Sequence, residues 1–282
     1  MNHCDETKGS PFISATLVLG AFAGILVFMW VLPSTPLGQW QRTLHWNYAS
    51  HVAFLILPIV MMALARRTPG EYGLRSNNVS RELVVGGVAF LVLVAAPLLG
   101  EGVFGQLRLK HTSMGFVVST VFFQIVLSGF GEEFLFRGFF QGELNRALGR
   151  PLSWGNLRFG WGVFITAALF GIGHLLNPFN PLTGQVQFDI TALFMTGIAG
   201  LVFGFVREYF GGILAASLIH AGWDLISSLF ALGAAGNIAT GVAIFGLCVY
   251  LTNLVNSSGD PAESPRKDSD DENTTGTTLR PD

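Results

Sequence analysis

The sequence predicts an all-α fold, that of a polytopic membrane protein built as an eight-helix transmembrane bundle. Two observations lead to this prediction. Half of the 282 residues are hydrophobic and only 12% are charged. Apolar stretches long enough to span a bilayer also recur along most of the chain and stop before a polar C-terminal tail. The lipid bilayer is therefore an expected partner, and nucleic acid is not.

Eight stretches have the length and composition of membrane spans. Residues 13–254 are predicted to form one membrane domain, preceded by a cytoplasmic tail at 1–12. Residues 255–282 are predicted to be a disordered polar tail, because they are rich in Ser, Asp, Thr and Pro and carry no apolar periodicity. The predicted helices are Ile13 to Leu32, Ala49 to Ala65, Glu82 to Leu99, Gly115 to Phe136, Trp161 to Leu175, Ile190 to Val206, Ile213 to Leu232 and Ile238 to Leu254.

The distribution of Lys and Arg between the stretches predicts the orientation. With an even number of spans, both termini lie on one side of the membrane. If that side is the cytoplasm, the other side receives only Arg42, Arg108 and Lys110, which leaves 13 of the 16 basic residues on the cytoplasmic side. Cytoplasmic segments of membrane proteins carry the excess of Lys and Arg. The sequence thus predicts a multi-pass protein of the cell membrane with cytoplasmic N- and C-termini.

Three ionisable residues interrupt the fourth stretch: Glu132, Glu133 and Arg137. A charged side chain within a bilayer costs at least about 2.5 kcal/mol, so such residues are functional candidates. Glu133 and Arg137 are four residues apart, on one helix face, in the favourable acid-before-base order. Glu132 has no cation nearby in the sequence, so its proton affinity is expected to be raised, as for a general base. The alternative is a charge cluster at the end of a helix.

A histidine ends the fifth stretch, in Phe170-Gly171-Ile172-Gly173-His174. A lone histidine at a helix end is more often a capping or interfacial residue than a functional one. Here the two glycines leave space beside the imidazole for water, another helix or a substrate backbone. Phe170 precedes His174 by one turn and is expected to form a wall of that space.

The seventh stretch carries a second histidine with an acidic partner. His220 and Asp224 are four residues apart, and Asp224 is flanked by apolar residues, so it should face the bundle interior or a wet cavity. An Asp one turn from a His can fix the orientation of the ring. His51, in the second stretch, has no acidic neighbour in the sequence and is interpreted as interfacial.

Titratable residues concentrate in the fourth, fifth and seventh stretches, which predicts one shared polar site, because an isolated charge would carry the full cost of burial. Counting about 1.5 Å per residue from the cytoplasmic ends places Glu132 and His220 at similar depths. His174 falls nearer the far end of its helix. A carboxylate, an imidazole and a second polar pair suit activation of water and stabilisation of an oxyanion.

Three motifs together resemble the CPBP family of intramembrane proteases, which includes the CAAX prenyl endopeptidases of the Rce1 type and many bacterial homologues. The resemblance covers about residues 83–245, the expected protease core, and implies an eight-helix bundle and an intramembrane endopeptidase acting on a membrane-associated peptide or protein. The motifs are Glu132-Glu133-x-x-x-Arg137, Phe170-x-x-x-His174 and His220-x-x-x-Asp224.

The resemblance also implies a role for each motif. Glu132 and His174 would activate the hydrolytic water, and Glu133 with Arg137 would support that arrangement. His220 and the residue at position 224 would contact the oxyanion. The prenyl endopeptidases have Asn where this chain has Asp224, and an ionised carboxylate cannot donate a hydrogen bond. Either Asp224 is protonated, or it orients His220 and the imidazole donates; we favour the second.

The cofactor and the function class each have an alternative. Glu132, His174 and His220 could supply three ligands for zinc, but the sequence has no H-E-x-x-H pair, so a mechanism without metal or other cofactor is favoured. A non-proteolytic carrier or an immunity-type scaffold could use the same buried charges for a proton relay or for packing. Carriers often contain repeats with broken helices in matching positions, and no such repeat is evident here.

Overall fold

Helices dominate the computed structural model, which describes residues 10–76, 78–104 and 107–257. Most of the predicted N-terminal tail and residues 258–282 of the predicted C-terminal tail lie outside the described residues. In chain order the elements are α1 (Pro11–Val31), η1 (Leu32–Ser34), α2 (Pro36–Arg42), α3 (Tyr48–Leu64), α4 (Val79–Val103), α5 (Met114–Phe122), η2 (Phe123–Glu132), η3 (Phe134–Phe140), α6 (Gln141–Leu148), β1 (Leu152–Trp154), β2 (Leu157–Phe159), α7 (Gly162–Leu175), α8 (Ile190–Phe210), α9 (Leu214–Leu229) and α10 (Ala234–Ser257).

The chain is a multi-pass, helical membrane protein, as predicted. Among the described residues, five helical segments are long and apolar enough to cross a membrane. Three further apolar helices, α3, α7 and α9, are shorter. Each of these eight segments overlaps one of the eight predicted stretches. That all eight cross the membrane remains a prediction, because the three shorter helices fall below the usual spanning length of about 17 residues or only reach it.

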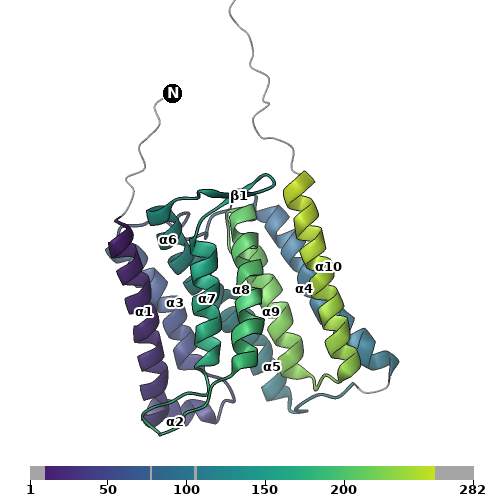
Figure 1. The fold of residues 1–282 in the computed structure, drawn as a ribbon. Coiled ribbons are helices and arrows are strands. Elements are labelled where there is room, and N and C mark those ends of the chain that lie inside the picture. The colour runs from purple at the N-terminus through teal and green to yellow at the C-terminus, as the bar shows by residue number, and fades with distance from the viewer. Residues whose placement is uncertain (1–9, 77, 105–106, 258–282) are drawn as a thin grey trace, which may run out of the picture.

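The helices run side by side, roughly parallel or antiparallel, with α1 at one edge of the bundle and α10 at the other (Figure 1). α1 begins and α10 ends at the same end of the bundle, where α6 and the two strands also lie (Figure 1). This agrees with an even number of crossings. Which side of the membrane this end faces remains a prediction.

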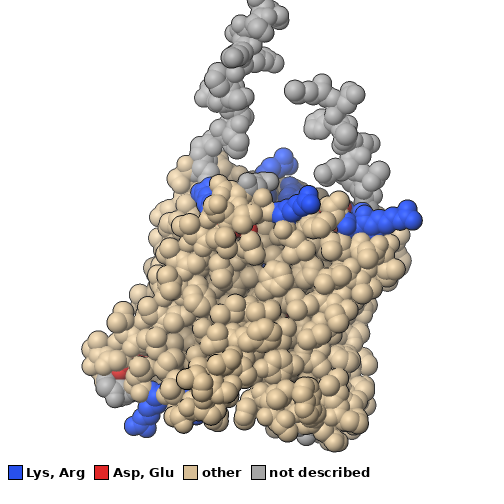
Figure 2. Space-filling model, turned by 180° about the vertical axis from the view of Figure 1, so that it is seen from behind, with Lys and Arg blue, Asp and Glu red and all other residues tan. Residues whose placement is uncertain are grey.

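The outer surface is apolar around the middle of the molecule. On the face that Figure 2 shows, Lys and Arg side chains lie at the two ends, and the belt between them is free of charged residues. Large apolar side chains point outward from several helices, among them Leu19 on α1, Val88 on α4, Phe194 on α8 and Phe245 on α10. Exposed apolar area of this extent is expected where lipid, rather than water, surrounds a protein.

Side chains of the loops fix where several helices begin and end. The Asn78 side chain accepts from the Arg81 N–H at the start of α4, Ser113 accepts from Phe116 N–H at the start of α5, and Asp189 accepts from Ala192 N–H at the start of α8. Each cap satisfies an N–H group that has no partner within its helix. α8 ends at Phe210, and the next residue, Gly211, has a φ of 75°, a left-handed conformation that favours glycine.

The predicted fourth span is longer and less regular than expected. One continuous helical segment runs from Met114 to Leu148, and η2 and η3 within it are π-helical, with backbone hydrogen bonds between residues i and i+5. The helix continues past Phe136 because the polar residues that follow remain covered: Gln141, Glu143 and Asn145 are all buried.

The fold is not purely helical, because it contains a short antiparallel hairpin. β1 pairs with β2 through Leu152 and Phe159 at one end and Trp154 and Leu157 at the other, and the turn contains Gly155 at φ 56°. Leu157 and Phe159 face inward and pack with apolar residues of α7 and α10, forming a small cluster apart from the main core. The hairpin thereby covers the ends of these helices.

Buried acidic residues also occur on α4, where the sequence analysis assigned none to the interior. Glu101, near the end of α4, accepts hydrogen bonds from the backbone N–H groups of Gly233 (2.6 Å) and Gly236 (2.7 Å) at the start of α10. A carboxylate at a helix N-terminus is favoured by both the free N–H groups and the helix dipole. Glu101 thus links α4 to the start of α10, and this structural role explains its burial.

Candidate active site

The predicted pair of Glu133 and Arg137 forms in the centre of the protein. Both side chains are 0% exposed, and Arg137 Nη1 lies 3.0 Å from Glu133 Oε1. Arg137 Nη2 donates to the backbone carbonyl of Gly200 on α8 at 3.0 Å. The guanidinium also lies over the rings of Phe170 (4.5 Å) and Phe203 (5.2 Å). Charge, hydrogen bonding and cation–π contact together offset the cost of burying the cation.

His220 joins this pair to Asp224, a link between the two motifs that the sequence analysis did not predict. Its Nδ1 lies 2.9 Å from Glu133 Oε1, and its Nε2 lies 3.3 Å from Asp224 Oδ2. Ser128, which was not a candidate, donates to the same Asp224 oxygen at 2.7 Å. Since both imidazole nitrogens face carboxylate acceptors, His220 can donate to both only as imidazolium.

Glycine allows the helix bearing the glutamates to approach its neighbours. A Cβ on Gly129 would lie 2.7 Å from the Ala221 Cβ and 2.9 Å from the Ser217 carbonyl, so η2 packs on α9 at a distance that only glycine permits. This contact brings His220 to Glu133. On α8, a Cβ on Gly200 would lie 3.0 Å from Arg137 Nη2.

Glu132 has a partner that the sequence analysis missed. His51 Nε2 on α3 lies 2.9 Å from Glu132 Oε1, and the two side chains are 12% and 10% exposed. The sequence analysis found no partner for Glu132 near it in the sequence and no acidic neighbour for His51. Both observations concern neighbours in the sequence, whereas this contact joins residues 81 positions apart.

His174 lies near the end of α7, as predicted, and its ring is fixed by Phe170. Nδ1 lies 2.9 Å from the Phe170 carbonyl oxygen, and the two rings contact edge to face with centroids 4.6 Å apart. A carbonyl only accepts, so Nδ1 carries the proton and Nε2 of the neutral ring is left as an acceptor. Glu132 lies within electrostatic reach of His174, His51 and His220.

The proposed zinc ligands Glu132, His174 and His220 do not fit a metal in this arrangement. Both nitrogens of His220 face carboxylates, which leaves neither for a metal. Across the described residues, no group of three or more His, Cys, Asp or Glu side chains is arranged to hold a metal ion. A zinc site would require His220 to leave at least one of its two carboxylate partners.

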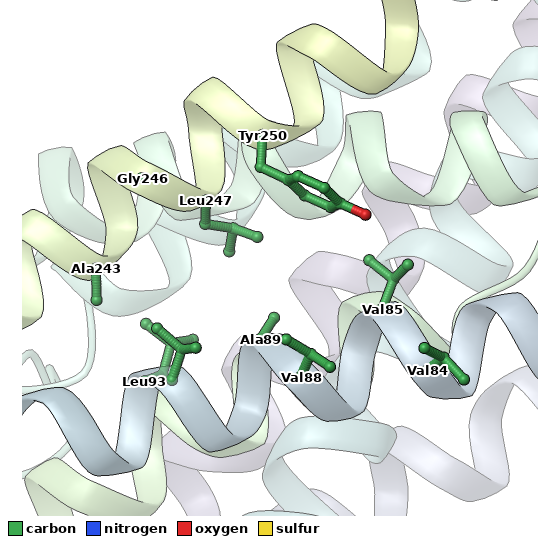
Figure 3. A pocket seen from close by; sticks show the side chains of 10 residues that line it. Val84, Val85, Val88, Ala89, Leu93, Ala243, Gly246, Leu247 and Tyr250 are labelled. Atoms are coloured by element: carbon green, nitrogen blue, oxygen red, sulfur yellow. The ribbon is translucent and has the colours of Figure 1, made fainter. Parts of the chain in front are cut away.

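An apolar cavity of about 370 Å³ lies elsewhere, between α4 and α10 (Figure 3). Tyr250 is the single polar side chain among its lining residues, and none of the candidate site residues lines it. The cavity therefore has no carboxylate or imidazole in its lining. Its lining is Val84, Val85, Val88, Ala89, Val92, Leu93, Ala243, Gly246, Leu247 and Tyr250.

Comparison with known proteins agrees with the motifs. Residues 113–226 match the Rce1-like family, described as type II CAAX prenyl endopeptidase Rce1-like. The match spans 114 of the 282 residues, so this part of the chain is similar to that family. The matched segment contains all six predicted site residues and thus confirms the resemblance to the CPBP family; His51 lies outside it. No curated protein and no solved structure matches the chain.

Proposed function

We propose that this chain is an intramembrane endopeptidase in which Glu132 and His174 activate water for attack on a peptide bond. The observation that carries the proposal is that His174 and Glu132 each present a hydrogen-bond acceptor to the site. In the neutral ring of His174, Nε2 is the acceptor, because Nδ1 donates to the Phe170 carbonyl. Glu132 presents a carboxylate within electrostatic reach of that ring. A water between two acceptors can direct one O–H bond to each and is thereby polarised.

The reaction consists of two proton transfers around one addition. Glu132 removes a proton from the water as the water oxygen bonds to the carbonyl carbon, and the carbonyl π electrons move to oxygen. The oxyanion then re-forms the C=O bond, the C–N bond breaks, and the leaving nitrogen takes the proton from Glu132. The products are a carboxylic acid and an amine, and one water has been added.

His220 is proposed to stabilise the oxyanion as a cation. The imidazolium is held at Nδ1 by Glu133, whose charge is balanced by Arg137. The longer contact, 3.3 Å from Nε2 to Asp224, is the one that an oxyanion would replace. Asp224 accepts from both Ser128 and His220 through one oxygen, which supports the ionised form that orients the ring.

The proposed mechanism uses no metal or other cofactor, since both nitrogens of His220, one of the three candidate zinc ligands, face carboxylates. The proposed substrate is a membrane-associated peptide or protein, since the site lies within a helical membrane bundle. The family description names CAAX prenyl endopeptidases. The proposed orientation places both termini in the cytoplasm, following the excess of basic residues.

Isotope labelling tests the reaction directly. Purified protein in lipid nanodiscs is incubated with a set of membrane-anchored peptides in ¹⁸O-water, and products are identified by mass spectrometry. One ¹⁸O should enter the new C-terminal carboxylate. Glu132→Gln should lower turnover by about 10² to 10⁴-fold, as is typical when a general base is removed. Activity should survive a strong chelator.

A matched substitution, Glu71→Gln, changes an exposed carboxylate outside the site and should leave turnover unchanged. Near-normal turnover by folded Glu132→Gln would refute the mechanism. Loss of activity on chelation, restored by zinc alone, would refute the metal-free proposal. A carrier or scaffold would release no labelled product with any peptide in the set.

A further inference from the structure

We infer that His51 is a positioning residue for Glu132: it holds one carboxylate oxygen so that the other faces the water. This inference rests on the proposed function and extends it to α3, outside the segment that matches the Rce1-like family. The contact that carries it is the 2.9 Å distance between His51 Nε2 and Glu132 Oε1.

The imidazole of His51 is held by two aromatic rings and at both nitrogens. Phe54 and Phe123 contact the ring, with centroids 4.9 and 4.6 Å away. Nδ1 lies 3.0 Å from the backbone carbonyl of Asn47, the residue that precedes α3. The ring can neither flip nor swing without breaking one of these contacts. His51 is thus a rigid support, since its position follows from the start of α3.

The direction of the hydrogen bonds follows from the chemistry of the acceptors. The Asn47 carbonyl accepts only, so Nδ1 carries a proton. A second proton then lies between Nε2 and Glu132 Oε1, because two lone pairs facing each other at 2.9 Å would repel. With the Glu132 carboxylate ionised, this proton is on Nε2, and the bond is charge-assisted, a class about twice as strong as neutral hydrogen bonds.

The two oxygens of Glu132 therefore have different environments. Oε1 is held by His51, and among the described residues no hydrogen bond reaches Oε2. The glutamate side chain has three rotatable bonds, and without a partner its carboxylate would sample several orientations. Misplacing a reacting group by about 1 Å can cost about 10²-fold in rate. His51 removes this freedom and leaves Oε2 as the atom that accepts the proton of water.

Three variants of the full chain separate positioning from packing. His51→Leu keeps an apolar side chain between Phe54 and Phe123 but removes the donor. His51→Gln restores an N–H donor at a similar distance from the backbone. His111→Leu is the control, since His111 packs on Phe116 with ring centroids 4.3 Å apart and is not a partner of Glu132.

For His51→Leu, kcat should fall by about 10²-fold with KM within about twofold of the parent, because substrate binding does not use Glu132. His51→Gln should retain kcat within about fivefold, since a neutral donor gives a weaker bond of the same geometry. His111→Leu should match the parent. Parental kcat in His51→Leu, or equal losses in the Leu and Gln variants, would overturn the inference.

Infrared spectroscopy tests the contact without relying on turnover. The spectrum of the parent minus that of Glu132→Gln isolates the carboxylate bands of Glu132. These bands should shift in His51→Leu, remain close to the parental position in His51→Gln and be unchanged in His111→Leu. An unshifted band in His51→Leu would overturn the inference. If no peptide is cleaved by the parent but the band shifts, the proposed function fails while the His51 contact stands.

Discussion

Replacing Glu133 by Gln should destabilise the fold and abolish activity together. Glu133 Oε1 is the common partner of Arg137 (3.0 Å) and His220 (2.9 Å). Gln has the same shape but no charge, and its amide oxygen cannot offset two cations. The substitution therefore leaves a fully buried guanidinium without its counter-ion and removes the group that holds the His220 ring at Nδ1.

The size of the effect follows from burial. Removing one partner of a buried ion pair typically costs about 3 to 5 kcal/mol. Arg137 keeps its bond to the Gly200 carbonyl and its contacts with Phe170 and Phe203, so we expect the lower half of that range, about 3 to 4 kcal/mol. Activity should fall as well, since His220 loses its fixed orientation.

The free energy of unfolding can be measured by titrating SDS into mixed micelles and following tryptophan fluorescence. Glu71→Gln is the matched control: Glu71 pairs with Arg67 at 3.8 Å and its side chain is 39% exposed, so this change should cost less than about 1 kcal/mol. Adding Arg137→Met to Glu133→Gln should recover part of the stability but no activity. A loss below about 1 kcal/mol for Glu133→Gln would refute the argument that the pair is buried and mutually required.

Two further substitutions test neighbouring contacts. Asp224→Asn should lower kcat/KM by about tenfold or more, because the His220 ring loses the charge-assisted contact, worth about 1.5 to 3 kcal/mol, that orients it before the oxyanion forms; full activity measured on the same peptide would show that Asp224 is protonated and donates. Tyr72→Phe removes the 3.1 Å bond to Glu143 and should cost about 1.5 to 3 kcal/mol of stability, measured by the same SDS titration. Burial and the Glu143 carboxylate hold the pKa of Tyr72 well above its usual range. The parent should therefore lose stability as the pH rises above about 10, because the Tyr72 hydroxyl releases its proton more readily in the unfolded chain. Tyr72→Phe should lack this part of the alkaline loss of stability. Equal losses in both proteins would contradict the role given to Tyr72.

Most of the helices could be predicted because lipid-facing segments must be apolar and must satisfy their backbone groups internally. The hairpin was missed, although its signal is present: Leu152 to Phe159 alternates apolar and polar residues around Gly155-Asn156, a two-residue turn. The end of the fourth helix was also placed too early. The polar residues after Phe136 remain helical and buried because they pair with residues of α8, such as Glu208, which accepts from Gln141 at 2.7 Å.

The pairs within the motifs could be predicted because they lie one helical turn apart. Glu133 with Arg137 and His220 with Asp224 both form. The contacts between motifs could not be predicted in the same way, because the helical repeat relates residues within one helix and says nothing about which residues meet across two helices. Ser128 lay in an uncharged run and offered no signal of its own. The burial of Glu132 did offer one, because a buried carboxylate requires a partner and none was available nearby in the sequence.

The need of each buried charge for a partner explains how the site is arranged. Glu133 balances Arg137 and His220, Asp224 faces the other nitrogen of His220, and Glu132 faces His51. These residues come from α3, the η2–η3 segment and α9, and two of the contacts, Glu133 with His220 and Glu132 with His51, join different helices. A substitution on one helix must then change the orientation of groups on the others. It follows that stability and activity should be coupled at Glu133, which balances two cations, and much less so at His51, which has one carboxylate partner and lies at the beginning of its helix.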